Sequence, residues 1–329
     1  MGIKEQKLED LGFELVHDPE STLIESNNCD LNALVEDEVE YKLRQFEFGY
    51  SNEYDKLESV MIHIPRKNEI EYFDPKRAMY KAIPNYEKLL EEVDAYKKKL
   101  ISLGIFVYDD LYFHETEYNR FPNQIYMRDL AVIMPDAIIL ANPKYDIRKG
   151  EEKNMLATLR HWGYSGRVIE LSSRVTMEGA DFFWISESEV LISIGNRTSE
   201  DFISTFKFFY PNIKVNTVAA APEGIPQHIL GGAHIVSKDT IIQRRSIVKH
   251  DLGFKNVISL DETDEVVNGY AMNVVTIGPH EIIMPEGNPE TQKIYEAHGI
   301  KVHTSPAYEL GKMGGCFACC SLPIKRSKK

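Results

Sequence analysis

Cysteine residues gather in the run Gly314-Gly315-Cys316-Phe317-Ala318-Cys319-Cys320-Ser321. Three of the four cysteines lie here, directly after two glycines that can adopt backbone conformations closed to other residues. A thiol held in such a turn can face a pocket and act as a nucleophile, provided that a histidine and a carboxylate assist it. The competing interpretation is a small buried hydrophobic residue, the usual fate of a free cysteine. Cys319 is the candidate nucleophile.

Composition limits what such a thiol could act on. The 329 residues carry a net charge of -13 without a basic stripe, which disfavours nucleic acid or an anionic membrane as a partner and favours a cationic or zwitterionic small molecule. No apolar run approaches the roughly 20 residues of a membrane span, and the first residues lack the apolar core of a signal peptide. We therefore expect a cytoplasmic protein. The oligomeric state stays open, a homo-oligomer included.

The chain divides into an acidic N-terminal extension, residues 1–45, and a main body, residues 46–329. Cys29 is isolated from the other cysteines, so the sequence suggests no disulfide framework and fits a reducing compartment.

The main body repeats a unit of two strands around a short polar turn, followed by a helix and a further strand. The predicted strand pairs are Leu130–Ile133 with Ala137–Leu140, Phe182–Ile185 with Val190–Ile194, His234–Val236 with Thr240–Gln243, and Asn273–Ile277 with Glu281–Met284. The predicted helices are Glu151–Trp162, Ser199–Phe209 and Pro289–His298, the last with Asn288 as N-cap. An earlier copy comprises the strand Leu57–Ile64, the helix Tyr86–Leu103 and the strand Ile105–Tyr108. Five α/β modules result.

Modules that each bury a face against a neighbour can close into a ring around a central cavity, although a doubly wound sheet would also alternate strands with helices. The positions of the reactive residues favour the ring. Asp129, Glu178, His228 and Cys319 lie at comparable points in their modules, next to a first strand or in the Gly-Gly-Cys turn. In a ring these points converge on the axis.

These segments resemble the guanidine-modifying enzymes of the pentein superfamily, which include arginine deiminase, dimethylarginine dimethylaminohydrolase and the amidinotransferases. The resemblance runs from about Tyr50 to the end of the chain. It rests on the ordered set Ser51–Pro65, Met127-Arg128-Asp129, Glu178-Gly179-Ala180-Asp181, Gly195-Asn196-Arg197-Thr198, His228-Ile229, the Asn273 strand and Glu309–Ser321. It implies a five-module α/β propeller around a closed active site, with neither metal nor cofactor.

The resemblance also implies roles for individual residues. Cys319 would attack the guanidinium carbon as a thiolate, and Cys320 would be a bystander. His228 would protonate the departing amine and later activate water or an acceptor amine, with its imidazole fixed by Glu178. Further residues are expected to bind the substrate: Asp129 as the guanidinium clamp, Arg197 as the holder of a substrate carboxylate, and also Asp181 and Leu230.

Each role has a structural alternative. Asp129 could pair with Arg128 at a strand end, and Arg197 could belong to a solvated loop. His234 competes with His228 but falls on an apolar strand. A zinc site at the cysteines with His303 would lack a second Cys-x-x-Cys pair.

Leu230 marks a departure within the resemblance. Arginine deiminases and glycine amidinotransferase carry Asp at this position, two residues after the histidine, whereas dimethylarginine hydrolases lack it. Losing that carboxylate should weaken binding of an unsubstituted guanidinium and leave apolar room for a substituted nitrogen. Three functions remain: a hydrolase of arginine or an N-substituted arginine that yields citrulline with ammonia or an alkylamine, an amidinotransferase, and a catalytically silent binding protein. The intact cysteine, histidine and glutamate argue against the third.

Overall fold

The computed structural model describes residues 46–71, 74–109, 121–219, 228–249 and 251–327. Residues Gln45–Lys329 make up one compact unit. The predicted N-terminal extension, with Cys29, lies outside the described residues, so its extent stays a prediction. No helix among the described residues is long and apolar enough to cross a bilayer.

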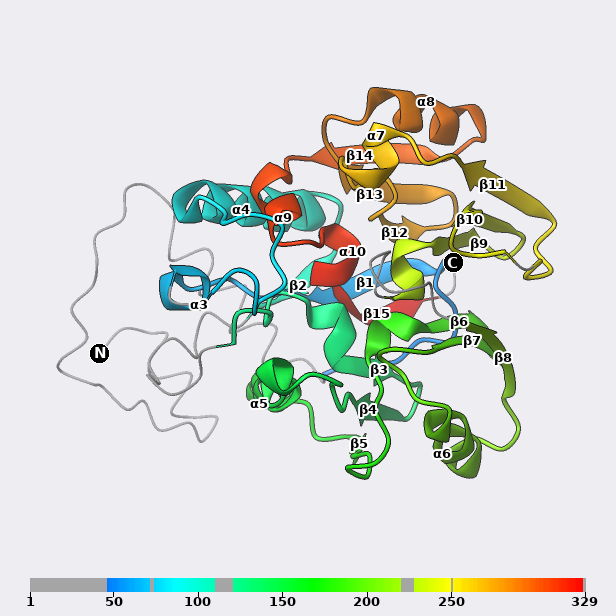
Figure 1. Cartoon of the computed structure of the whole chain (residues 1–329). Helices are drawn as coiled ribbons and strands as arrows, with labels where there is room; N and C mark the ends of the chain where they lie inside the picture. The colour runs from blue at the N-terminus through cyan, green and yellow to red at the C-terminus, as the bar shows by residue number, and fades with distance from the viewer. Residues whose placement is uncertain (1–45, 72–73, 110–120, 220–227, 250, 328–329) are drawn as a thin grey trace, which may run out of the picture. The chain divides into compact units, whose positions relative to one another are not determined.

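Five three-stranded sheets form the described part of the chain, which confirms the predicted modules (Figure 1). In four sheets an antiparallel hairpin is followed by a third strand parallel to the second strand. Their strands are β3 (Ala131–Ile133), β4 (Ala137–Leu140) and β5 (Arg167–Ile169); β6 (Phe182–Ser186), β7 (Glu189–Ile194) and β8 (Lys214–Ala219); β9 (Ala233–Ser237), β10 (Thr240–Arg244) and β11 (Asn256–Leu260); and β12 (Val275–Gly278), β13 (Glu281–Pro285) and β14 (Lys301–Ser305). The hairpin turns are short and polar and the strands are apolar. The hairpin of each of these four modules can therefore be predicted from the sequence.

The first module draws on both ends of the described chain. β1 (Lys56–Met61) pairs in parallel with β2 (Phe106–Tyr108) and antiparallel with β15 (Leu322–Ser327). β15 therefore occupies the place that the first hairpin strand takes in the other modules. The strand β15 was not predicted, since nothing near it in sequence repeats the hairpin pattern.

Helices connect the second and third strands of most modules. The long helices are α4 (Tyr86–Ser102), α5 (Glu151–His161), α6 (Asp201–Phe209) and α8 (Pro289–Ala297), and the short ones are α3 (Lys67–Glu71), α7 (Asp264–Val267), α9 (Tyr308–Lys312) and α10 (Phe317–Cys320). The four long helices match the predictions to within two residues at each end. Between β10 and β11 the described residues contain no helix. In Figure 1, α5, α6 and α8 lie at the periphery and α10 near the centre.

The start of α8 corrects one detail of the prediction. The helix begins at Pro289 with Asn288 before it, but the Asn288 side chain makes no capping hydrogen bond. The carboxylate of Glu265 instead accepts hydrogen bonds from the backbone N–H groups of Glu290 (3.0 Å) and Thr291 (2.7 Å). A carboxylate from α7 thus satisfies donors that an N-cap side chain would otherwise bind.

Helix α4 anchors the segment that carries the cysteines. Its first turn is capped by Asn85, whose side chain accepts a hydrogen bond from the N–H of Lys88. On its buried face Tyr96 stacks on Phe317 of α10, with 4.2 Å between ring centroids, and its hydroxyl bonds to the Ser321 hydroxyl at 2.7 Å. The position of α10 is therefore set by a helix that precedes it by more than 200 residues.

Candidate active site

In four of the five modules, a short turn next to the first strand carries the reactive residue. Asp129 lies in the 3₁₀ turn η2 (Met127–Leu130), Glu178 directly precedes η4 (Gly179–Asp181) and His228 directly precedes η5 (Ile229–Gly231). In the first module the corresponding segment is α10, with Cys319. η2 contacts both η4 and α10, and η4 contacts η5. The predicted convergence of these four residues is therefore observed.

Glycines allow the turns to approach this closely. A Cβ atom on Gly179 would lie 2.2 Å from the carbonyl oxygen of Ala131, closer than any real contact. In the same way, a Cβ on Gly315 would lie 2.5 Å from the ring of Tyr126 and 3.3 Å from the Cβ of Cys319. Larger residues at these positions would push η4 away from β3 and the thiol away from η2.

A cavity of about 630 Å³ lies where the turns meet. Four of the predicted residues line it: Asp129, His228, Leu230 and Cys319. The other three predicted residues, Glu178, Asp181 and Arg197, are buried and are not among the lining residues.

Behind the cavity wall, Glu178 collects three cations. One of its oxygens accepts a hydrogen bond from His228 Nε2 at 2.8 Å, and Arg148 Nη1 lies 3.3 Å from the same oxygen. Arg197 Nη1 contacts both carboxylate oxygens at 3.0 Å. Burial alone would raise the pKa of Glu178, but the hydrogen bond from His228 and the charges of Arg148, His228 and Arg197 outweigh it and hold the pKa well below its usual range. The carboxylate is therefore charged at neutral pH.

His228 is held as an imidazolium. Burial opposes its charged form, but the carboxylates of Asp129, Asp181 and Glu178 outweigh burial and raise the pKa of His228 to about 9. Its Nε2 is engaged by Glu178, so Nδ1 is the nitrogen left for a ligand, 3.9 Å from Asp129 Oδ1. At neutral pH this residue can donate a proton.

Asp129 has one occupied and one unoccupied oxygen. Its Oδ2 accepts a hydrogen bond from Arg148 Nη1 at 2.6 Å, and Arg148 is fixed in turn by Glu151, with Nε to Oε2 at 2.9 Å. Asp129 Oδ1 is buried and makes no hydrogen bond with the described residues. A buried acceptor without a partner is costly unless a ligand satisfies it.

Cys319 lies across the cavity in a neutral setting. Its Sγ accepts a hydrogen bond from Asn273 Nδ2 at 3.1 Å, and the Asn273 Oδ1 accepts the backbone N–H groups of Ala318 (2.8 Å) and Cys319 (3.3 Å). Burial, followed by the negative charge of Asp129, raises the pKa of the thiol to about 11. The thiol is therefore protonated at neutral pH until a cation is placed beside it.

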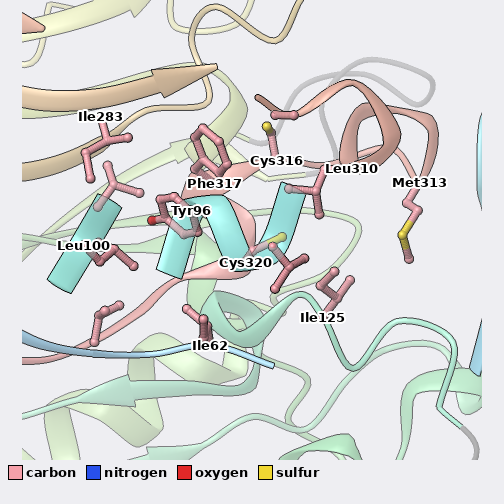
Figure 2. Close-up of a cluster of buried hydrophobic side chains, with 14 of the residues drawn as sticks. Ile62, Tyr96, Leu100, Ile125, Ile283, Leu310, Met313, Cys316, Phe317 and Cys320 are labelled. Carbon is pink, nitrogen blue, oxygen red and sulfur yellow. The ribbon is translucent and has the colours of Figure 1, made fainter. Parts of the chain in front are cut away.

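The two neighbouring cysteines belong to the hydrophobic core. Cys316 is fully buried and Cys320 is 5 % exposed, and both pack in the cluster that contains Tyr96 and Phe317 (Figure 2). Burial raises the pKa of both thiols well above the usual range. Their surroundings are those of structural cysteines.

Arg197 and Asp181 occupy supporting positions in this structure. The Arg197 guanidinium is 2 % exposed, faces Glu178, and lies over the ring of Tyr145, 4.4 Å from its centroid. Asp181 accepts hydrogen bonds from the Thr198 hydroxyl (2.8 Å) and the backbone N–H of Ile229 (3.3 Å). Burial raises the pKa of Asp181 to about 6. Their predicted contact with substrate stays a prediction.

Sequence reasoning missed three residues of the site. Asn273 lies two residues before β12, and Asp129, Glu178 and His228 likewise lie shortly before the first strand of their modules, so the module rule could have found it. Asn123 lines the cavity, is 1 % exposed, and forms no hydrogen bond through either amide atom with the described residues. No sequence signal separates Arg148 from other arginines.

Asp129, Glu178 and His228 could also be considered as metal ligands, because one ligand atom from each lies within 4.8 Å of the others. The charge balance fits another use. Arg148 and Arg197 already supply positive charge at these carboxylates, and the imidazole is held protonated rather than neutral. The cluster is better matched to a single organic cation.

The sequence of this chain is similar to those of known proteins. A model of the arginine deiminase family matches residues 111–207 and 239–326, more than half of the chain. An N(G),N(G)-dimethylarginine dimethylaminohydrolase from Pseudomonas aeruginosa is 22% identical over 245 residues, which span 73% of this chain and 89% of that protein. An uncharacterised protein from Aeropyrum pernix is 25% identical over 245 residues, 73% of this chain and 85% of its own.

Solved structures share the fold. A mutant of the Pseudomonas aeruginosa dimethylarginine dimethylaminohydrolase in complex with citrulline superposes with a TM-score of 0.66 at 19% identity, covering 81% of this chain and 99% of that one. The N-terminal domain of ArgZ, a cyanobacterial arginine dihydrolase bound to product, superposes with a TM-score of 0.68 at 17% identity, covering 83% of this chain and 98% of that one. The amidinotransferase SxtG from Microseira wollei superposes with a TM-score of 0.66 at 14% identity, covering 86% of this chain and 98% of that one.

These likenesses confirm the predicted five-module pentein propeller and the predicted superfamily. Together with the match of the family model over more than half of the sequence, they show that the chain belongs to the arginine deiminase family, among the penteins that modify guanidino groups.

Proposed function

We propose that this protein is a hydrolase that cleaves a C–N bond in the guanidinium of arginine or an N-substituted arginine, through a covalent amidino-thioether on Cys319. The observation that carries the proposal is the shared cavity: Cys319, His228 and Asp129 all line it, and Asp129 Oδ1 makes no hydrogen bond with the described residues. A guanidinium needs these three partners: an acceptor for its N–H groups, a nucleophile for its carbon and an acid for its leaving nitrogen.

Binding activates the nucleophile. Asp129 Oδ1 accepts a hydrogen bond from a guanidinium N–H, which places the cation near Sγ. The positive charge lowers the pKa of Cys319 from about 11, and the thiol proton passes to solvent. The thiolate is therefore formed where its electrophile is already bound.

Two steps follow. The thiolate of Cys319 bonds to the guanidinium carbon, and the C–N bond breaks as His228 gives its proton to the departing amine. The neutral imidazole then takes a proton from water, which adds to the amidino carbon as hydroxide; as the tetrahedral intermediate collapses, its hydroxyl proton passes to solvent, the C–S bond breaks, and citrulline and the thiolate are released. Glu178 keeps the imidazole oriented and favours its charged state in both steps.

Leu230 indicates whether the guanidinium nitrogen of the substrate carries an alkyl substituent. It lines the cavity, is 4 % exposed, and brings no carboxylate to the guanidinium. An apolar wall at this point favours an alkylated nitrogen over a bare one, because a bare N–H there would lose its hydrogen bond to water. This supports a dimethylarginine-hydrolase type of reaction over a simple deiminase.

An amidinotransferase is the alternative. It shares the first half-reaction, and an acceptor amine then takes the place of water before the same imidazole. The structural likeness to an amidinotransferase is the observation that keeps this candidate in view.

Acid-quenched mass spectrometry distinguishes the two. The protein is mixed with arginine, methylated arginines, agmatine and guanidinoacetate, and ureido products are measured in parallel. A ureido product with a transient mass increment, absent in Cys319→Ser, is expected for the hydrolase. An adduct discharged only by added amines would establish the transferase, and no adduct with any compound would overturn both.

A further inference from the structure

The outer part of the cavity is lined by groups that the proposed reaction does not use. These are Lys81, Arg244, Ser246, Glu262, Val266, Val267 and Tyr270. Two of them, Lys81 and Arg244, are cations and one, Glu262, is an anion, whereas Asp129 at the reaction centre lies beside the cations Arg148 and His228. The cavity therefore offers a carboxylate oxygen on Asp129 for a cationic group and the ammonium of Lys81 for an anionic group of the same ligand.

The arginines nearest the reaction centre are already engaged. Arg148 contacts Asp129, Glu151 and Glu178, and its side chain is 3 % exposed. Arg197 contacts Glu178 from outside the cavity lining. Moving either one to an incoming carboxylate would leave Glu178 short of a buried counter-charge, a costly exchange.

Arg244 is engaged as well. Its Nε donates to Glu262 Oε1 at 3.0 Å, and its Nη2 contacts the other oxygen of the same carboxylate. The pair is bidentate and locally neutral.

Lys81 differs from these arginines. Among the described residues, no carboxylate lies within ion-pair distance of its ammonium, which sits over the Tyr270 ring, 4.4 Å from the centroid. A ring face holds a cation in place without neutralising it. Burial, and then the charge of Arg244, lower the pKa of Lys81, so an anion between these two cations would relieve their repulsion.

The backbone is strained at Tyr270 and at Met79, close to Lys81 in sequence. Met79 has φ of 62° and Tyr270 has φ of 54°, a left-handed conformation that non-glycine residues rarely adopt. Both residues line the cavity, and Met79 lies two residues before Lys81. Such conformations persist where the surrounding structure holds a functional side chain in place.

We propose that Lys81, seated on Tyr270, anchors the carboxylate of the substrate, so that the protein selects guanidino acids over guanidino amines. The inference rests on the proposed function, because the guanidinium is assumed to lie between Asp129 and Cys319. It assigns carboxylate recognition to a lysine at the outer end of the cavity, whereas Arg197 is a positioning residue for Glu178.

The test compares arginine with agmatine, which carries the same guanidinium and lacks the carboxylate. Lys81→Met keeps most of the aliphatic stem and removes the charge, Lys81→Arg keeps the charge, and Lys76→Met is the matched control on an exposed lysine outside the cavity. Losing a charge-assisted contact should lower kcat/KM for arginine about 10- to 100-fold, mainly through KM, and leave agmatine within a factor of about three. Lys81→Arg and Lys76→Met should stay close to the parent for both compounds.

Equilibrium binding to Cys319→Ser separates this inference from the proposed chemistry. A Lys81-dependent preference for arginine over agmatine supports the anchor even where the parent protein turns over neither compound, an outcome that would sink only the hydrolase. Equal losses for both compounds in Lys81→Met, or a loss confined to arginine in Arg197→Met with none in Lys81→Met, would overturn the anchor. Absence of binding by both compounds would overturn the anchor and the proposed function together.

Discussion

The two sides of the reaction centre are built from different interactions. On the carboxylate side, Asp129, Glu178 and His228 lie in a network of buried charges closed by Arg148 and Arg197. On the thiol side, Cys319 is held by one amide, Asn273, and by the glycine turn that precedes it. One side is charged and rigidly paired, and the other is neutral.

This difference explains how the free thiol stays protonated and unreactive when no substrate is bound. Burial, and then the negative charge of Asp129, disfavour a thiolate here, and this is why the pKa of Cys319 lies at about 11. Cys319 therefore becomes a nucleophilic thiolate only when a cation binds between the two sides. The predictions below disturb one side at a time.

The largest effect is expected from the thiol itself. Cys319→Ser should lower kcat by at least about a thousandfold, because a serine hydroxyl in this neutral setting is far less acidic than the thiol. Cys320→Ser should retain turnover within a few-fold and lose stability, because a hydroxyl is placed in the core. Steady-state kinetics well below each melting temperature measure this contrast, and equal losses in both variants would contradict the assignment of Cys319.

Glu178→Gln breaks the charged side. Three cations each lose one buried carboxylate partner, so we expect destabilisation of about 3–5 kcal/mol and a drop in kcat of about a hundredfold. The pKa of His228 should fall from about 9 toward its ordinary 6.5, which moves the alkaline limb of the kcat profile to lower pH. An unchanged alkaline limb would show that His228 is not the acid.

The free energy of unfolding should also depend on protonation of His228. Because the pKa of His228 is raised in the folded state, the folded chain binds a proton that the unfolded chain releases between pH 6.5 and about 9. The stabilisation is complete below pH 6.5 and is lost as the pH rises through about 9. Urea unfolding across this range should show a decline that His228→Asn lacks; parallel curves for the two proteins would refute the raised pKa.

Asn273→Ala disturbs the neutral side. Two backbone N–H groups of α10 and the thiol lose their partner, which should cost about 1–3 kcal/mol of stability. The pKa of Cys319 should rise, since the hydrogen bond from Asn273 lowers it. Alkylation by iodoacetamide as a function of pH, read by mass spectrometry of the peptide that contains Cys319 in a Cys320→Ser background, reports this directly; faster alkylation of Cys319 at neutral pH would be the opposite of the expected result.

The smallest effect is a change in preference. Leu230→Asp adds a second carboxylate at the cavity wall and should shift kcat/KM several-fold toward arginine and away from its dimethylated form. The ratio of the two kcat/KM values in competition is the measurement. A constant ratio would show that Leu230 does not contact the guanidinium.

Local patterns account for what could be predicted. The hairpins around Pro135-Asp136 and Lys238-Asp239 are marked by apolar strands and polar turns, so their modules follow from short-range sequence, and the turn before each first strand locates Asp129 and His228. The residues that these side chains contact could not be predicted from short-range sequence. Arg148 reaches Asp129 from the segment after β4, and Lys81 reaches Tyr270 across almost 190 positions of sequence, pairings that only the closed fold creates.

The pairing of β1 with β15 has a consequence for synthesis. Lys56 faces Ser327, so β1 leaves the ribosome 271 residues before its antiparallel partner (327 minus 56). At about 5–20 residues per second, the edge of β1 stays without this partner for roughly 14–54 s. Over that interval the nascent chain exposes an unpaired strand edge, and the nucleophile, which lies just before β15, is itself unmade. A growing chain therefore has no route to premature chemistry, but it depends on the cell to keep one sheet edge from pairing elsewhere.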